Sequence, residues 1–138
     1  GASPVRIASE VYATTPQSTA LLMKMLSNLK IRKGVGWSFL TRKNYKTTGA
    51  KDSETDNFIK SIRSIKKIDI AVLFKEINYK AVKVSCRAKH GYDVNYIATK
   101  LNGGGHKYAA GCKIRKPLKQ AMKLVLAAVK KHGRRKRK

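Results

Sequence analysis

The stretch LNGGGHKYAAGC, residues 101–112, contains residue types that are suited to binding a phosphate or a nucleotide. Glycine loses more conformational entropy on folding than any other residue, so three in a row indicate a sharp turn or a close approach to the backbone. Glycines after a helix expose N–H groups in a concave turn that can hold a phosphate. His106 follows directly, and Arg87 and Lys89 lie on the polar face of a preceding predicted strand. These groups together favour a phosphodiester or a nucleotide carbonyl as the ligand.

The same stretch also has a structural interpretation, in which the glycines end a helix and His106 is an exposed side chain. Catalysis finds little support, because a general base needs a neighbour that tunes it and no carboxylate follows Asp93. The histidines His90, His106 and His132 are scattered along the chain. The nucleophile motif G-x-S-x-G, the S-x-x-K motif with its partner motifs, and the phosphate-binding P-loop motif are absent. We therefore predict no catalytic residue and no metal site in this chain.

The charge balance points to a polyanionic partner. The 138 residues include 32 Lys and Arg against 7 Asp and Glu, a formal net charge of +25. Such an excess destabilises the folded state by self-repulsion, and binding to nucleic acid relieves it because each neutralised phosphate releases counterions. The alternative is a lysine-rich proteome in which basic residues only solvate the surface. The C-terminal RRKRK could serve as a nucleic-acid-binding arm, as a localisation signal or as an artificial extension.

The cysteines and the hydropathy indicate the compartment. Cys86 and Cys112 have no close C-x-x-C spacing, and no signal-like apolar segment is present. We expect free thiols in the cytoplasm or another reducing interior. No apolar run approaches the length of a membrane span, so we expect a soluble protein without a membrane partner.

Hydrophobic spacing predicts alternating helices and strands. Helical turns are expected at residues 5–11, and a helix starts at Pro16 with an apolar stripe of Leu21, Leu22, Met25, Leu26 and Leu29. Residues 35–40 suit a strand. Asp52 or Ser53 can cap the next helix, whose stripe is Phe58, Ile59, Ile62 and Ile65. The acidic residues around Asp52 suit this helix start better than a cation site.

A hairpin of two strands, residues 68–77 and 79–89, follows. In the second strand Val82, Val84, Cys86 and Ala88 share one face, and Lys83, Ser85, Arg87 and Lys89 share the other. Helices are expected at 94–101, capped by Asp93, and at 117–131, with a turn and a strand between them. This order predicts an α/β fold, with helices packed on a mixed β-sheet.

The order of these segments carries a family resemblance. IDIAVLFKEI, VKVSCRAK, YDVNYIATKL and NGGGHKYAAGC together resemble the DHH-associated C-terminal domain of the DHH phosphoesterase family. The similarity is greatest to the branch of nano-RNases and phosphoadenosine phosphatases, which also includes linear and cyclic dinucleotide phosphodiesterases. In that branch a strand with S-x-R, a helix opened by D-V-N and a GGGH-x-x-A-A-G loop occur in this order.

The resemblance implies that residues 103–106 form a nucleotide-binding loop and that Arg87 assists on the phosphate or base. It also implies that residues 109–111 keep the base of the loop closely packed. Together with the basic residues beside the strand and the loop, the candidate nucleotide-binding residues are Arg87, Lys89, Gly103, Gly104, Gly105, His106 and Lys107.

One feature of the family is missing from this chain. The Asp-His-His signature and the other ligands of the family's manganese pair belong to an N-terminal catalytic domain, and no D-H-H occurs here. The resemblance thus implies no cofactor in this chain and manganese in the missing domain. We expect residues 1–67 to be a helix-strand-helix segment that leads from that domain, 68–131 to be a DHH-associated nucleotide-binding domain, and 132–138 to be a disordered basic tail.

The function predicted is to bind oligonucleotide substrate for a DHH-type phosphoesterase, an exonuclease or short-RNA phosphodiesterase. The expected partners are RNA or a single-stranded oligonucleotide and a catalytic domain or larger nucleoprotein assembly. The chain alone is not expected to be catalytic, although it resembles the C-terminal part of a hydrolase. The alternative is a non-catalytic basic RNA-binding or assembly protein with a vestigial site. The alanyl-tRNA synthetase C-terminal domain shares this architecture, but its loop differs after the glycines.

Overall fold

The computed structural model describes residues 15–133. The helical turns expected at 5–11 and residues 134–138 of the expected basic tail lie outside the described residues. In chain order the elements are α2 (Pro16–Ser27), β1 (Lys30–Arg32), β2 (Val35–Leu40), α3 (Arg42–Thr48), the 3-10 helix η1 (Asp52–Thr55), α4 (Phe58–Arg63), β3 (Ile70–Asn78), β4 (Ala81–Ala88), α5 (Val94–Lys100), β5 (Gly104–His106), β6 (Ala109–Ile114), α6 (Leu118–Ala128) and the π-helix η2 (Val129–Gly133).

The strands form one mixed sheet of six in the order β1-β2-β3-β4-β6-β5. β2 pairs with β3 in parallel, and the other neighbours pair antiparallel. Between β2 and β3 the chain forms α3, η1 and α4, which together make the crossover that a parallel pair requires. The predicted α/β class and mixed sheet are therefore confirmed.

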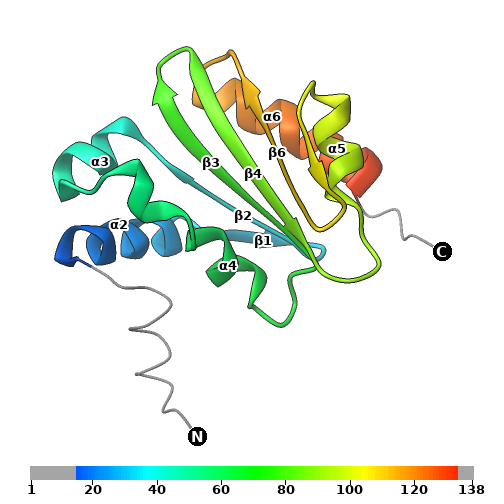
Figure 1. Cartoon of the computed structure of the whole chain (residues 1–138), viewed down its shortest axis with the longest axis horizontal. Coiled ribbons are helices and arrows are strands. Elements are labelled where there is room, and N and C mark those ends of the chain that lie inside the picture. The colour runs from blue at the N-terminus through cyan, green and yellow to red at the C-terminus, as the bar shows by residue number, and fades with distance from the viewer. Residues whose placement is uncertain (1–14, 134–138) are drawn as a thin grey trace, which may run out of the picture.

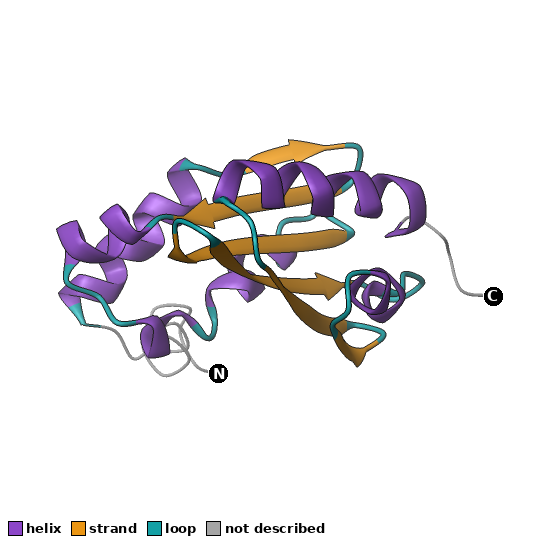
Figure 2. Cartoon of the chain, turned by 90° about the horizontal axis from the view of Figure 1, so that it is seen from above, coloured by secondary structure: helices purple, strands orange, loops and turns teal. Residues whose placement is uncertain are grey.

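Helices cover both faces of the sheet (Figure 1). On one face α5 and α6 pack over a core that includes Val72, Phe74 and Val84, and Figure 2 shows α6 running along this face. On the other face α2, α3 and α4 enclose a second core around Leu21, Ile62 and Leu73. The segment before residue 68 and the segment after it share one sheet, because β2 pairs with β3. β3 supplies residues to both cores.

Local sequence signals set most of the helix ends. The Thr15 hydroxyl accepts a hydrogen bond from the Ser18 N–H at 3.0 Å, and Pro16 takes the first position of α2, as predicted. The Asp93 carboxylate accepts one from the Tyr96 N–H at 3.2 Å, which confirms the predicted cap of α5. The hairpin of β3 and β4 turns beside Asn78, whose side-chain oxygen accepts from the Lys80 N–H at 2.8 Å.

The structure departs from the sequence prediction in several elements. The single helix expected after residue 52 is divided into η1 and α4. Strand β1 and helix α3 were not predicted, because β1 has three residues, all exposed, and α3 has one buried residue, Tyr45. Leu26 was expected in the buried stripe of α2 but is 43% exposed. Helical backbone also extends to Gly133, two residues into the segment expected to be disordered.

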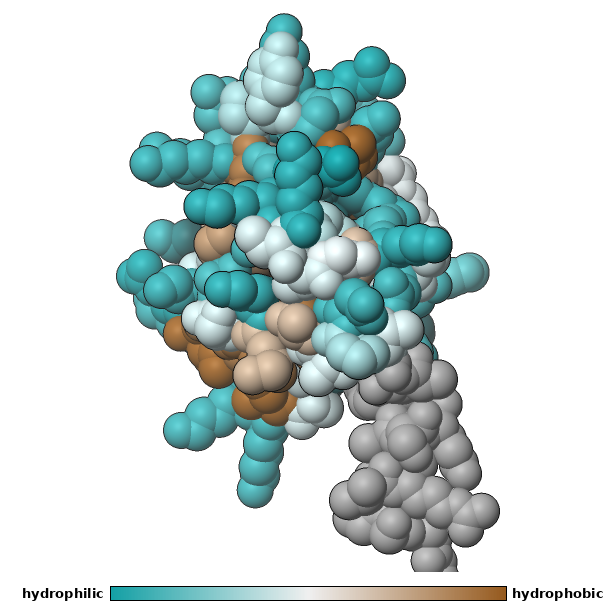
Figure 3. Space-filling model, turned by 90° about the vertical axis from the view of Figure 1, so that its left-hand side faces the viewer, coloured by the Kyte–Doolittle hydropathy of each residue, from teal (hydrophilic) through white to brown (hydrophobic). Residues whose placement is uncertain are grey.

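Hydrophilic side chains dominate much of the surface. Figure 3 views the molecule from the end where α2 and α3 lie, and long hydrophilic side chains project from most of that face, with smaller apolar patches between them. Within residues 15–133, none of the helices has both the length and the apolar character that are needed to cross a membrane.

Candidate nucleotide-binding groove

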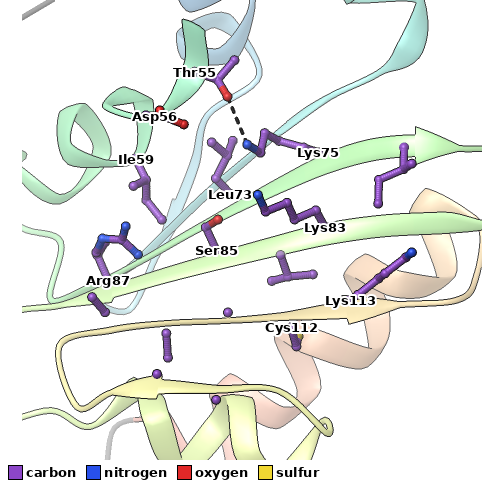
Figure 4. Close-up of a pocket in the computed structure, with 17 residues that line it drawn as sticks. Thr55, Asp56, Ile59, Leu73, Lys75, Lys83, Ser85, Arg87, Cys112 and Lys113 are labelled. Carbon is purple, nitrogen blue, oxygen red and sulfur yellow. Dashed lines mark hydrogen bonds between the residues drawn. The ribbon is translucent and has the colours of Figure 1, made fainter. Parts of the chain in front are cut away.

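One face of the sheet is only partly covered by helices. There α2, α3 and α4 enclose their core over β2 and β3, and a groove of about 640 Å³ lies beside them over β4, β6 and β5. Thr55, Asp56 and Ile59 from η1 and α4 form one wall (Figure 4). The floor comes from the strands, and their register arranges its side chains in rows.

The central row of the floor consists of small residues. Ser85 on β4 is opposite Gly111 on β6, and Gly111 is opposite Gly104 on β5. These positions share one face of the sheet because directly paired residues point the same way. A floor without bulky side chains leaves room for a flat ligand against the strands.

Charged residues lie on both sides of this small-residue row. On one side is Arg87, opposite Ala109 on β6, which in turn is opposite His106 on β5. The guanidinium of Arg87 donates to the Cys86 carbonyl at 3.0 Å, so the side chain is held against its own strand. On the other side Lys75, Lys83 and Lys113 are paired across β3, β4 and β6, and we call them the lysine row.

Gly104 and Gly105 belong to strand β5, so the glycine run does not form the phosphate-cradling turn that the sequence suggested. Helix α5 ends at Lys100 with Leu101 as its C-cap, and Gly103 donates its N–H to the Ala98 carbonyl at 2.7 Å. The chain then forms β5 against β6. An added Cβ at Gly103 would lie 2.1 Å from the Gly111 carbonyl oxygen. The tight packing of the β5-β6 hairpin therefore explains part of the need for glycine.

The remaining two glycines of the run differ from each other. Gly105 has a φ of +144°, and an added Cβ there would lie 2.6 Å from the Ala109 carbonyl oxygen. A Cβ at Gly104 would meet nothing within 4 Å, and Gly104 lines the groove. Only Gly104 among residues 103–105 therefore combines a lining position with open space where a side chain would stand.

The predicted site residues fall into two groups. Arg87, Gly104 and Gly105 line the groove, whereas His106 and Lys107 are not among its lining residues. His106 is exposed on β5, in register with Arg87 across Ala109. Lys107 is exposed, and its ammonium lies 5.0 Å from the centre of the Tyr108 ring.

Lys89 points to a different part of the molecule. Its ammonium donates to the Ile65 carbonyl at 2.9 Å and to the Lys66 carbonyl at 3.3 Å, which holds the segment after α4 against β4. Lys89 and Gly103 do not line the groove. The contacts of Lys89 are therefore structural ones, which the alternation along the strand could not distinguish from a polar site.

The three lysines that line the groove, Lys75, Lys83 and Lys113, are not among the candidate site residues predicted from the sequence. Alternation along each strand places Lys83 on the face of Arg87, but it does not say which residue of β3 or β6 stands opposite. The lysine row appears only once the register of three strands is known. Thr55 and Asp56 belong to a separate segment, and nothing in the sequence placed them beside β4.

A hydrogen-bond network anchors one end of the lysine row. Lys75 is 6% exposed, and its ammonium lies 3.0 Å from the Thr55 hydroxyl and 3.1 Å from an Asp52 carboxylate oxygen. The Tyr45 hydroxyl donates to the same oxygen at 2.9 Å. Burial raises the pKa of Tyr45 well above its usual value, and hydrogen bonding to Asp52 raises it further. Tyr45 thus remains a protonated donor at neutral pH.

Asp52 makes the stability of the fold sensitive to acid. Burial acts to raise its pKa, but hydrogen bonds from Tyr45 and Lys75 and the lysine charges outweigh burial, so the pKa of this carboxyl lies below its usual value. A carboxyl with a lowered folded-state pKa stabilises the fold above its unfolded-state pKa of about 3.9, and this contribution is lost as the pH falls through the folded-state pKa.

We expect Asp52→Asn to lower the free energy of unfolding at pH 7 by about 1 kcal/mol or less, because the carboxylate is largely exposed. Its effect should shrink as the pH falls below about 4. Urea unfolding at pH 7, 4 and 3 measures this, with Asp56→Asn as the charge-matched control. An effect of Asp52→Asn that is equal at pH 7 and pH 3 would contradict the assignment.

The cysteines and the other potential ligands contribute no reactive centre to the groove. Burial raises the pKa of the Cys86 thiol to about 12 and that of the Cys112 thiol to about 11, and both cysteines are free. Thiols with such pKa values are protonated at neutral pH and are poor nucleophiles. Within residues 15–133, no three His, Cys, Asp or Glu side chains lie close enough together to hold a metal ion.

The model of the DHHA1 domain matches residues 39–132, which is more than half of the chain. The chain belongs to the DHHA1 domain family. The family resemblance found in the sequence is thereby confirmed, and the matched residues include every strand that contributes to the floor of the groove.

Three longer proteins are similar to this DHHA1 chain, and the chain matches only a part of each. The bifunctional oligoribonuclease and PAP phosphatase NrnA of Thermus thermophilus is 36% identical over 80 residues, which cover 57% of this chain and 24% of NrnA. The chain thus matches about a quarter of the length of this curated relative. The similarity in sequence therefore concerns one segment of NrnA and leaves most of its length without a counterpart here.

Solved structures share the fold of the DHHA1 chain. An exopolyphosphatase-related protein from Bacteroides fragilis superimposes with a TM-score of 0.82 at 25% identity, over 95% of this chain and 39% of that protein. The pGpG-specific phosphodiesterase PggH from Vibrio cholerae superimposes with a TM-score of 0.62 at 14% identity, over 94% of this chain and 43% of PggH. The likeness to PggH concerns the fold alone.

Proposed function

We propose that this chain is the oligonucleotide-binding part of a DHH-type phosphodiesterase and that its groove holds short RNA. The observation that carries the proposal is the juxtaposition of Gly104, an open lining position, with Arg87 on one face of the sheet. A guanidinium can bind a phosphate with two parallel hydrogen bonds, and the small-residue row leaves space for the attached nucleoside. The name of NrnA, an oligoribonuclease, supports RNA as the ligand class.

Hydrolysis is assigned to a domain outside this chain. The described residues do not fit the manganese pair that the family resemblance implies, because no three potential ligands lie together among them. This chain's own residues bind and orient the substrate. Arg87 holds a phosphate, and His106 stands in the same register on β5, where it can donate to a phosphate or base. The small residues of the floor leave space for the nucleotide. The expected partner is a catalytic domain in a reducing interior compartment.

Arg87→Ala tests the proposal. It should weaken the binding of a labelled RNA of three to five nucleotides at least tenfold, or about 1.4 kcal/mol, because it removes the charged donor beside the floor. Fluorescence anisotropy at two salt concentrations, with and without excess mononucleotide, measures this. Arg115→Ala is the matched control, since Arg115 is exposed, carries the same charge and does not line the groove.

A second candidate function follows from the net charge of +25. A basic RNA-associated or assembly protein with a vestigial site would bind through many lysines, so its affinity would fall steeply with salt and ignore mononucleotides. Equal affinities of Arg87→Ala and Arg115→Ala, together with that behaviour, would favour this candidate over the groove.

A further inference from the structure

The lysine row places like charges side by side on the open part of the sheet. Lys75 is opposite Lys83, and Lys83 is opposite Lys113, so neighbouring members stand on strands that are only about 4.8 Å apart. Like charges directly opposite each other destabilise a sheet. The fold therefore gains nothing from this arrangement unless a negative charge compensates it.

Within the protein, an ion pair forms at only one end of the row, as far as the described residues show. Lys75 is buried and paired with Asp52. Lys83 and Lys113 are exposed, and neither forms an ion pair with a carboxylate among the described residues. Asp56 is the single carboxylate among the described residues that line the groove, and it stands on the opposite wall near Thr55 (Figure 4). Among the described residues, Lys83 feels the charge of Asp52 without an ion-pair contact, and Lys83 and Lys113 thus present to the groove two cations that no ion pair neutralises.

The position of these two lysines relative to Arg87 defines what they can bind. Lys83 and Arg87 lie four residues apart on β4, which is about 13 Å along a strand, and the small-residue row lies between them. With the Arg87 guanidinium held against the Cys86 carbonyl, this separation favours different phosphates at the two ends of the groove. A ligand with two phosphates also needs a connecting part thin enough to cross the floor of Ser85 and Gly111.

We infer that Lys83 and Lys113 form a second phosphate subsite, which takes a backbone phosphate beyond the one held at Arg87. This inference rests on the proposed function and deepens it. The groove then prefers an oligonucleotide with several phosphates over a mononucleotide or a dinucleotide with one. Lys75 is not a ligand in this arrangement, because its ammonium is committed to Thr55 and Asp52.

Binding as a function of RNA length tests the subsite. Oligoribonucleotides of two to five residues without terminal phosphates carry one to four phosphates, and their affinities are measured by competition with a labelled RNA. In Lys83→Gln/Lys113→Gln we expect the tetranucleotide to bind at least about fivefold more weakly while the dinucleotide changes by less than about twofold. The slope of log K against log salt for the tetranucleotide should fall by about one.

The matched control is Lys119→Gln/Lys123→Gln, which removes the same two charges from exposed positions on α6, on the opposite face of the sheet. A uniform loss of affinity at all lengths, or a loss no greater than in this control, overturns the subsite. Arg87→Ala separates the two proposals. If it weakens every length while the lysine variant shows no length dependence, the subsite alone fails. If Arg87→Ala leaves binding unchanged, the proposed groove itself fails.

Discussion

Gly104→Leu is expected to weaken short-RNA binding by more than about tenfold while leaving the fold intact. A Cβ at this position meets nothing within 4 Å, so the leucine side chain adds bulk to the floor of the groove without a clash. A surface substitution of this kind changes stability by about 0.5 kcal/mol, or roughly 2 °C in melting temperature for a chain of this size. Anisotropy titration and thermal unfolding of the same sample measure both quantities.

Gly105→Ala is the informative counterpart, because its added Cβ would lie 2.6 Å from the Ala109 carbonyl oxygen on a backbone with φ of +144°. It should strain the β5-β6 hairpin by about 1–3 kcal/mol and speed amide hydrogen exchange over residues 104–114, whereas Gly104→Leu should leave exchange there unchanged. Wild-type RNA affinity in Gly104→Leu would show that the ligand does not lie on the floor of this groove.

Much of the fold could be predicted from local signals. Apolar alternation located β3 and β4 and assigned Val82, Val84, Cys86 and Ala88 to the core, where all four are buried. The cap at Asp93 and the proline at position 16 fixed two helix starts. These features depend on residues close in sequence, and their patterns survive in the folded protein because tertiary packing favours the same conformations.

The missed elements have little local signature. β1 exists through its pairing with β2, in which Ile31 stands opposite Gly36, and its own three residues are exposed. The glycine run shows the same limit for the site. Its composition indicates that another group comes close to the backbone. In the structure part of that close contact is made by the protein itself, where Gly103 packs against Gly111. Distinguishing a ligand from a neighbouring strand requires the strand register, which depends on residues far apart in the sequence.

The lysine row illustrates how distant segments build a site. Each lysine is unremarkable in its own strand, within a chain that holds 32 Lys and Arg. Only the pairing of β4 with both β3 and β6 places Lys83 between two other lysines. The same pairing brings Arg87 into register with Ala109, so a small residue adjoins the guanidinium. The net charge of the chain suggests nucleic acid as a partner. The strand register shows where on the sheet the cationic side chains lie together.

The two cores should unfold together, because they lie on opposite faces of the same strand. Leu73 and Phe74 are neighbours on β3, are 1% and 0% exposed, and belong to different cores. We expect Phe74→Ala to lower the free energy of unfolding by about 3–5 kcal/mol and Leu73→Ala by about 2–5 kcal/mol. Each should move one cooperative transition down by about 7 °C or more, as followed by calorimetry and far-UV circular dichroism.

Ile31→Ala, at an exposed position of β1, is the control and should change the melting temperature by less than about 2 °C. A second transition that stays at the wild-type temperature in Phe74→Ala would mean that α2, α3 and α4 hold their core without the other face. That result would contradict the sheet pairing, because β2 is joined to β3 along its whole length, from Val35 opposite Ile70 to Leu40 opposite Lys75. Melting one face removes the strand on which the other core is built.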